Sequence, residues 1–174
     1  VGRNPPSAFV SPLELVGVDT VDEGARSLLQ QLFLMDGRLS HAVRTMMWHP
    51  SFVQHHTTAY SAIMKGDGPL PLPWRHYLAI LAAARHGCEY LVRQQEEEFL
   101  LHGGEEAWLQ GVEHVPRKVH NLLHFNALLC HQPWLLSKAH VEALVKGADS
   151  WSMAELAHAI VVMCTFHSLA GFVF

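Results

Sequence analysis

Cys88 is the residue in this sequence best placed for thiol chemistry. It follows Gly87, which closes the helical pattern of residues 74–86, where Ala, Leu and Arg dominate. Glycine readily adopts the left-handed conformation that ends a helix, so Cys88 is expected at or near the start of the next helix. The unpaired N–H groups and the positive end of the helix dipole there favour a thiolate, as do the nearby Arg85 and His86. The pattern therefore predicts a nucleophilic thiol at a helix N-terminus.

The same thiol also lies on an apolar stripe. The stripe recurs at helical spacing and consists of Tyr77, Leu81, Ala84, Cys88 and Leu91. Such a stripe normally faces a protein core, and free cysteine is among the most buried residue types. The residues alone therefore leave two interpretations of the thiol open: reactive, or buried and inert.

Histidine supplies the other candidate ligands and proton carriers, with 14 residues in the chain. Most are expected at scattered surface or half-buried positions. His120 and His124 are one helical turn apart, a spacing that can hold a metal ion, but the sequence fixes no third ligand. Cys164 and His167 share a helix face with apolar neighbours, which favours core packing.

His76 stands 12 residues before Cys88 and would approach the thiol only if the two helices fold back on each other. Residues 96–98, three glutamates, are typical of a solvated helix face. Trp134 and Trp151 are expected to be packing anchors, although an exposed tryptophan would instead indicate a protein contact.

The elements that must position these residues are helices. Caps, glycines and prolines bound each periodic apolar stretch, and no alternating pattern or Asn-Gly signal indicates a strand. Asp19 or Thr20 is the expected cap of the first helix, and Ser152 with Glu155 forms the capping-box pattern of the last. The expected helices cover residues 21–35, 39–48, 51–64, 74–86, 88–101, 116–130, 138–146 and 153–171.

The domain prediction follows from this pattern. Residues 1–20 form an irregular, proline-rich segment, and residues 21–174 are expected to form one all-α domain. Only 16% of the residues are charged, below the usual quarter, which suggests a domain that packs against more protein. The apolar run at 172–174 is interpreted as a fragment boundary. We therefore expect the isolated domain to self-associate.

Composition also limits the kinds of binding partner and the cellular compartment that we expect. The net charge is −4 and no dense basic block is present, which argues against nucleic acid. No signal-peptide pattern is present, and the last apolar run contains His158 and His167, so no membrane span is expected. Three widely spaced cysteines are unlike a disulfide framework and predict free thiols. The expected location is the cytoplasm, with the nucleus as an alternative.

Several segments resemble sestrins. Residues 74–92 are similar to the helix-turn-helix segment of that family. A longer match comprises HQPWLLSKAHVEAL at 131–144, SWSMAEL at 150–156 and FHSLAGF at 166–172. The resemblance extends over residues 7–174, and it corresponds to the N-terminal half of a sestrin.

The resemblance implies a fold and a cellular role. Sestrins are stress-induced intracellular proteins with two all-helical halves, each similar to alkylhydroperoxidase AhpD and carboxymuconolactone decarboxylase. The N-terminal half is credited with reducing small hydroperoxides. The C-terminal half, which would be a partner of this domain, carries leucine binding and much of the contact with the GATOR complex that restrains the TOR kinase. The resemblance implies no cofactor and no zinc.

The resemblance also implies site residues. The family's redox motif is a cysteine, a tyrosine two residues later and a histidine seven residues after the cysteine. Cys88 matches the first position and Tyr90, as a hydrogen-bond donor, the second, but Gln95 stands at the third. A neutral imidazole can pass a proton to a leaving alkoxide, whereas an amide only orients water. Proton delivery is therefore expected to be impaired.

A resolving thiol is also missing from the motif. AhpD-type enzymes carry a second cysteine three residues after the first, and here that position is Leu91. A sulfenic acid on Cys88 would need another partner, for which Cys130 and Cys164 are candidates only by elimination.

Two functions therefore remain open. The first is a weak thiol-dependent hydroperoxide reductase that uses Cys88. The second is a non-catalytic scaffold domain that supports the nutrient-sensing half.

Overall fold

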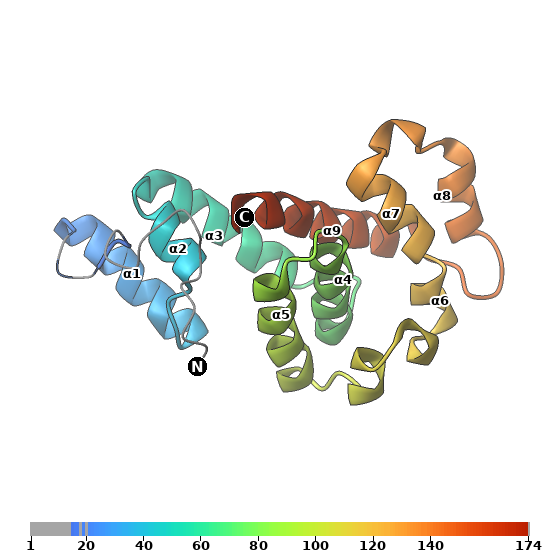
Figure 1. Ribbon diagram of the computed structural model, residues 1–174, viewed down its shortest axis with the longest axis horizontal. Coiled ribbons are helices and arrows are strands. Elements are labelled where there is room, and N and C mark those ends of the chain that lie inside the picture. Colours follow the sequence, from blue (N-terminus) through green and yellow to red (C-terminus); the bar gives the residue numbers. More distant parts are fainter. Residues whose placement is uncertain (1–14, 18, 20, 174) are drawn as a thin grey trace. The chain divides into compact units, whose positions relative to one another are not determined.

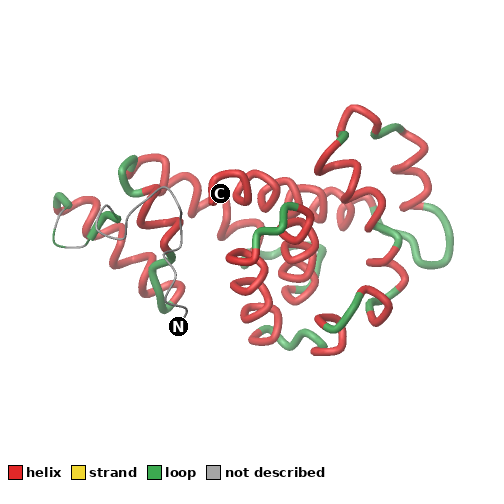
Figure 2. Tube along the Cα trace, viewed as in Figure 1, coloured by secondary structure: helices red, strands yellow, loops and turns green. Residues whose placement is uncertain are grey.

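The chain is all-helical, as predicted. A computed structural model describes residues 15–17, 19 and 21–173, and contains no strand within that part of the chain (Figures 1 and 2). Most of the proline-rich segment at residues 1–20 lies outside the described residues. The α-helices are α1 (Glu23–Asp36), α2 (His41–Met46), α3 (Pro50–Met64), α4 (Leu72–Arg85), α5 (Glu89–Leu101), α6 (Arg117–His120), α7 (Leu123–His131), α8 (Lys138–Val145) and α9 (Met153–Val173).

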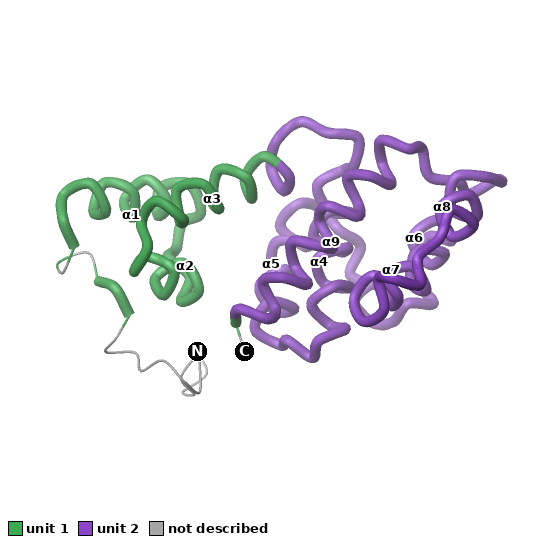
Figure 3. Tube along the Cα trace, turned by 90° about the horizontal axis from the view of Figure 1, so that it is seen from above, with its two compact units in different colours: residues 1–62, 173–174 green, residues 63–172 purple. Residues whose placement is uncertain are grey.

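The chain divides into two compact units, coloured separately in Figure 3. Unit 1 comprises residues 1–62 and 173–174, and unit 2 comprises residues 63–172. The sequence pattern did not predict this division, and the single domain expected over residues 21–174 stays a prediction. All the candidate site residues lie in unit 2.

Unit 1 contains α1, α2 and most of α3. The Asp22 side chain accepts a hydrogen bond from the Ala25 N–H (2.8 Å) and caps α1. The expected cap was therefore placed too early: Asp19 precedes the helix, and Thr20 lies outside the described residues. An N-cap must lie directly before the first helical turn, because its side chain accepts a hydrogen bond from a free N–H group of that turn. Asp22 meets this condition.

Unit 2 begins with the antiparallel pair α4 and α5, joined by the predicted bend. Gly87 has φ +66°, and its N–H donates to the Ala84 carbonyl (3.0 Å). The Cys88 N–H donates to the Ala83 carbonyl (3.2 Å), so the last carbonyls of α4 are satisfied in a Schellman-type turn. A side chain at Gly87 would be strained by this left-handed backbone. The bend is what places Cys88 directly before α5.

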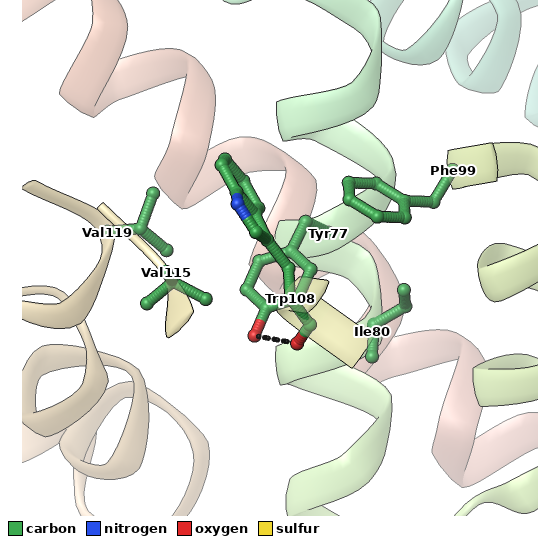
Figure 4. Packing of buried hydrophobic residues seen from close by; sticks show 6 residues of the cluster. All are labelled: Tyr77, Ile80, Phe99, Trp108, Val115 and Val119. Atoms are coloured by element: carbon green, nitrogen blue, oxygen red, sulfur yellow. Dashed lines mark hydrogen bonds between the residues drawn. The ribbon is translucent and has the colours of Figure 1, made fainter. Parts of the chain in front are cut away.

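Aromatic packing holds the far ends of α4 and α5 to the next segment. Trp108 lies in a short 3₁₀ turn (Glu106–Leu109) and packs edge-on against Tyr77, while the Tyr77 hydroxyl donates to the Trp108 carbonyl (3.2 Å) (Figure 4). The buried cluster drawn there consists of Tyr77, Ile80, Phe99, Trp108, Val115 and Val119. Gly104 lies so close to the Phe99 ring that a Cβ would overlap it. This cluster packs α4 and α5 against the segment that follows them.

The helix expected over residues 116–130 is wrong as a single element. The structure has α6 and α7 instead, separated by a tight turn at Asn121 and Leu122. The Leu122 N–H donates to the Val119 carbonyl three residues back (3.0 Å). Both Val119 and Leu122 are buried, and the tightened turn lets both side chains reach the core.

The last helix, α9, has 21 residues and is long and apolar enough to cross a membrane by length and composition alone. That observation is weak evidence, because core helices pass the same test. One face of α9 is buried, and a hydrogen bond joins the His158 Nε2 atom to the Ile63 carbonyl (2.8 Å), so this face packs against other residues of the described chain. The buried residues are Leu156, Ala159, Val162, Met163, Phe166 and Ala170.

The start of α9 confirms the predicted capping box. The Ser152 N–H donates to the Glu155 carboxylate (2.8 Å), and the Glu155 N–H donates to the Ser152 hydroxyl (3.2 Å). Lys118 of α6 donates to both Glu155 oxygens (2.8 Å each), and these bonds hold the pKa of Glu155 below its usual value. This ion pair connects α6 to the N-terminus of α9.

Glu155→Gln should lower the free energy of unfolding by about 1 kcal/mol at pH 7, since glutamine keeps the cap and loses the charge. A carboxyl with a lowered pKa stabilises the fold above its ordinary pKa, and this contribution is lost as the pH falls through the lowered value. The difference from the wild type should therefore vanish in acid. Urea denaturation at several pH values measures this difference in the free energy of unfolding. A difference that does not change with pH would contradict the ion-pair explanation.

Arg75 is a buried cation that holds the linker between α3 and α4. Its guanidinium donates to the carbonyls of Gly66 (2.6 Å), Leu70 (2.9 Å) and Ile63 (3.3 Å). Burial lowers its pKa, and the nearby Asp67 carboxylate opposes that effect. Arginine suits this position because its planar fork carries five N–H donors.

Arg75→Met should destabilise the fold by about 3 kcal/mol, because the three linker carbonyls lose their shared donor while the apolar stem is replaced. Arg75→Lys is the matched control, and it should recover only part of the loss, because an ammonium cannot reproduce the fork. Denaturant unfolding measures both variants. A loss below about 0.5 kcal/mol for Arg75→Met, as at an ordinary surface site, would show that the linker does not depend on this side chain.

Candidate functional site

Cys88 occupies the position that the sequence predicted, and it is also buried. It is the residue directly before α5, with φ −80° and ψ 79°, and its carbonyl accepts from the Val92 N–H (3.1 Å). Only 2% of Cys88 is exposed, whereas the flanking Gly87 and Glu89 are exposed. The structure thus confirms the burial and the position before a helix, whereas the reactivity of the thiol stays a prediction. Solvent reaches the sulfur only if the neighbouring side chains move.

Tyr90 and Leu91 lie in the first turn of α5. Tyr90 is half-buried, and within the described structure its hydroxyl forms no hydrogen bond to the Cys88 sulfur. Leu91 is buried and fills the position where AhpD-type enzymes carry a second thiol. The donor role of Tyr90 therefore stays a prediction that requires a bound peroxide.

Gln95 contacts a histidine that the sequence had left unplaced. The Gln95 Oε1 atom lies 2.8 Å from the His76 Nδ1 atom, and each residue is 1% exposed. An amide oxygen only accepts, so the Nδ1 atom carries the proton and the Nε2 atom of the neutral ring keeps a lone pair. That Nε2 atom has no hydrogen-bond partner in the described structure. An imidazole thus stands one hydrogen bond away from the amide that replaces the family's histidine.

The His76 ring also contacts a second pair of titratable residues, His102 and Glu98. His102 stacks on it with ring centroids 4.8 Å apart, and the His102 Nδ1 atom donates to the Glu98 carbonyl (2.8 Å). The Glu98 carboxylate is 4.0 Å from the same nitrogen. Burial lowers the pKa of His76, with a smaller lowering from the charge of His102, while the Gln95 hydrogen bond acts in the opposite direction.

The sequence interpretation missed His102 and assigned Glu98 to a solvated face. The signal was the spacing of residues 95, 98 and 102, which lie on one face of α5 at helical intervals.

A further cluster joins three helices close to the bend. The Nε2 atom of His86 lies 3.2 Å from the Cys130 sulfur and 3.1 Å from the Nδ1 atom of His167. The Nε2 atom of His167 bonds to the Asn126 Oδ1 atom (3.0 Å). His86 was expected to favour the Cys88 thiolate, but its ring is instead engaged with Cys130 and His167.

Burial lowers the pKa of His167 to about 4, with help from the charges of His86, His131 and Arg85. Burial also lowers the pKa of His86 and raises that of the Cys130 thiol, while Arg85 acts on Cys130 in the opposite direction. His167 is therefore neutral at neutral pH.

The weaker candidates mostly separate in space. His120 ends α6 and His124 lies in α7, so the two do not share one helix as expected, and the His124 ring lies 5.9 Å from that of His140. Cys164, expected in the core, is exposed, because it faces away from the buried side of α9.

The two tryptophans expected as anchors also differ. Trp151 is a buried anchor whose indole N–H donates to the Lys118 carbonyl (2.9 Å). Trp134 is 75% exposed, so its expected packing role is wrong within the described residues.

Comparison with known proteins decides the family. Residues 5–174 match the family model described as PA26 p53-induced protein (sestrin). The chain belongs to the sestrin family. It is 51% identical over 168 residues to a sestrin homolog of Dictyostelium discoideum, covering 97% of this chain and 28% of that protein. It is 44% identical over 170 residues to mouse sestrin-3, covering 97% of this chain and 34% of that protein.

Bovine sestrin-2 is 43% identical over 178 residues, covering 99% of this sestrin chain and 37% of that protein. The chain thus spans about a third of the length of the curated sestrins that it matches. The expected correspondence to the N-terminal half agrees with this partial coverage.

A solved structure shares the fold of this sestrin. It is described as the alkylhydroperoxidase AhpD core of an uncharacterized peroxidase-related protein from Ralstonia eutropha. The TM-score is 0.70 with 15% sequence identity, over 97% of this chain and 88% of that one. The expected AhpD-like fold is confirmed.

Proposed function

We propose that this sestrin domain is a slow hydroperoxide reductase that uses the Cys88 thiol, within a protein that regulates redox balance and TOR kinase signalling under stress. The observation that supports the chemistry most is the position of Cys88 at the N-terminus of α5, behind the Gly87 bend, on an AhpD-like fold. The free N–H groups and dipole of α5 stabilise negative charge at that sulfur.

The proposed reaction has two steps. The Cys88 thiolate attacks the terminal oxygen of a hydroperoxide, the O–O bond breaks, and the alkoxide takes a proton and leaves as an alcohol. Cys88 is oxidised to a sulfenic acid. Two equivalents of an external thiol then reduce the sulfenic acid to the thiol, with release of water and formation of the reductant's disulfide.

Three features of the structure are expected to make the reaction slow. Cys88 is 2% exposed, so the peroxide reaches the sulfur only during transient opening of its surroundings. Gln95 offers no transferable proton, and the neighbouring His76 is held neutral because burial lowers its pKa. Buried Leu91 also denies the site a local resolving thiol, so each turnover depends on an outside reductant.

The second candidate is a non-catalytic scaffold that supports the nutrient-sensing half and its contacts with the GATOR complex. The burial of Cys88 favours this alternative, as does the amide at position 95. It requires the fold but no chemistry at the sulfur.

Steady-state consumption of an alkyl hydroperoxide, with excess dithiothreitol, separates the two candidates. The reductase proposal expects the purified chain to consume peroxide above the rate of dithiothreitol alone, in proportion to protein concentration. Heat-unfolded protein, in which all three thiols are exposed, is the control for unspecific thiol oxidation. Equal rates of peroxide consumption with and without folded protein would rule out the reductase and leave only the scaffold candidate.

A further inference from the structure

Three side chains from different helices of unit 2 present donor atoms to one point. His86 follows the end of α4, Cys130 lies in α7 and His167 in α9, and all three are half-buried. Their two nitrogens and one sulfur lie within 4.8 Å of one another. Half-burial leaves the group reachable by a small ion from solvent. His86 lies 44 residues before Cys130 and 81 residues before His167, so the fold rather than a local motif assembles the group.

The spacing of these atoms suits a tetrahedral metal ion. Zinc binds imidazole nitrogen at about 2.0 Å and thiolate sulfur at about 2.3 Å, which separates two ligand atoms by about 3.3 to 3.6 Å. The observed separations are 3.1 Å for His86 Nε2 to His167 Nδ1 and 3.2 Å for His86 Nε2 to Cys130 Sγ. Outward shifts of a few tenths of an ångström would admit the ion. The two imidazole planes cross at 69°, so their in-plane lone pairs can converge.

Asn126 orients one of the ligands. Its Nδ2 atom donates to the Leu81 carbonyl (3.1 Å), which directs its Oδ1 atom towards the Nε2 atom of His167 (3.0 Å). Because the amide oxygen only accepts, His167 carries its proton on Nε2 and keeps the Nδ1 lone pair free for coordination. Such an orienting hydrogen bond accompanies most metal-binding histidines.

We propose that His86, Cys130 and His167 bind one Zn²⁺ ion, with water in the fourth position. Coordination replaces the hydrogen bonds that now join the three side chains. The Cys130 sulfur loses its proton to solvent and binds as a thiolate, so one proton leaves for each ion bound. Burial raises the pKa of the Cys130 thiol, and the charge of Arg85 only partly opposes that effect, so the bound ion must supply the main stabilisation of the thiolate. The Nδ1 atom of His131 is a further nitrogen beside the group, 3.6 Å from the Cys130 sulfur.

A second group of possible ligands in the described chain consists of His76, Glu98 and His102. Its donor atoms also lie within 4.8 Å of one another, but the orientation of its two rings does not suit a metal ion. The His76 and His102 rings stack at an angle of 27°, so their lone pairs run nearly parallel and do not converge. The Nδ1 atoms of both rings also hold hydrogen bonds. This group therefore serves as an internal comparison rather than as a second site.

The test is a titration of the reduced, metal-free 174-residue chain with Zn²⁺, monitored with a competing chromophoric chelator. The expected result is one tight site per chain, with release of one proton at neutral pH. Cys130→Ser and His167→Gln should each weaken binding by at least about 100-fold, since each removes one of three ligands. Cys164→Ser and His102→Gln are the matched controls, and both should bind as the wild type does.

Co²⁺ gives a second readout that unspecific binding to surface histidines does not produce. Bound at the proposed site it should show a thiolate-to-cobalt charge-transfer band, absent in Cys130→Ser and present in Cys88→Ser. Circular dichroism without metal verifies that each variant is folded. No tight Zn²⁺ binding, binding unchanged by Cys130→Ser, or a cobalt complex without the thiolate band would each overturn the proposal.

Discussion

Cys88→Ser should reduce the peroxide-dependent oxidation of dithiothreitol to the rate seen without protein. A serine hydroxyl at the same position is not a nucleophile towards peroxide oxygen, because only a thiolate attacks the O–O bond under these conditions. The replacement is nearly isosteric, and the bend rests on the Gly87 backbone and the Cys88 N–H rather than on the sulfur. The fold should therefore survive, and the measurement is the initial rate at saturating reductant.

Cys164→Ser and Cys130→Ser are the controls for this loss. Cys164 is exposed and would dominate if accessibility alone decided the rate, whereas Cys130 lies in the histidine cluster. Both variants should retain most of the peroxide consumption. If Cys164→Ser loses the activity and Cys88→Ser keeps it, the consumption is ordinary oxidation of a surface thiol.

Gln95→His should raise the rate of peroxide reduction by at least about 10-fold. The change places an imidazole where the amide now accepts from His76, and general acid catalysis by a positioned imidazole contributes about 100-fold or more in favourable cases. Part of that gain is lost because burial disfavours the charged ring. The variant should also acquire a pH dependence, with activity rising as the new imidazole becomes protonated below neutral pH.

Gln94→His is the matched control for Gln95→His, because it adds the same ring one position earlier on α5, at a half-buried position. It should leave the rate unchanged, since adjacent helical residues point in different directions. Equal gains from the two variants would indicate an unspecific buffer effect. No gain from Gln95→His, in a variant shown to be folded, would contradict the proposed limitation by proton delivery.

The sequence predicted those parts of the fold that depend on local chemistry. Gly87 stops α4 because a left-handed backbone position favours glycine, and Ser152 with Glu155 begins α9 through a reciprocal cap. Both signals lie within a few residues and need no knowledge of the rest of the chain. The division near Ala62 and the break between α6 and α7 depend instead on packing, since Val119 and Leu122 reach the core only through a tightened turn.

For the candidate site too, the sequence predicted the local features but not the contacts between helices. Cys88 could be placed at a helix start from its neighbours, but its burial depends on how α4 and α5 pack. The pairing of His76 with Gln95 joins positions 19 residues apart across the bend, and helical spacing does not show which rings meet. The His86, Cys130 and His167 cluster brings together three helices, so neither spacing nor composition could have identified it.

The identity of the first thiol oxidised tests the central claim most directly. The reduced chain is treated with less than one equivalent of an alkyl hydroperoxide in the presence of a sulfenic-acid-trapping reagent such as dimedone, and peptide mass spectrometry locates the adduct. The account predicts the adduct on Cys88, ahead of the exposed Cys164 and the half-buried Cys130. An adduct on Cys164 or Cys130, with Cys88 left unmodified, would contradict the assignment of Cys88 as the peroxide-reducing thiol.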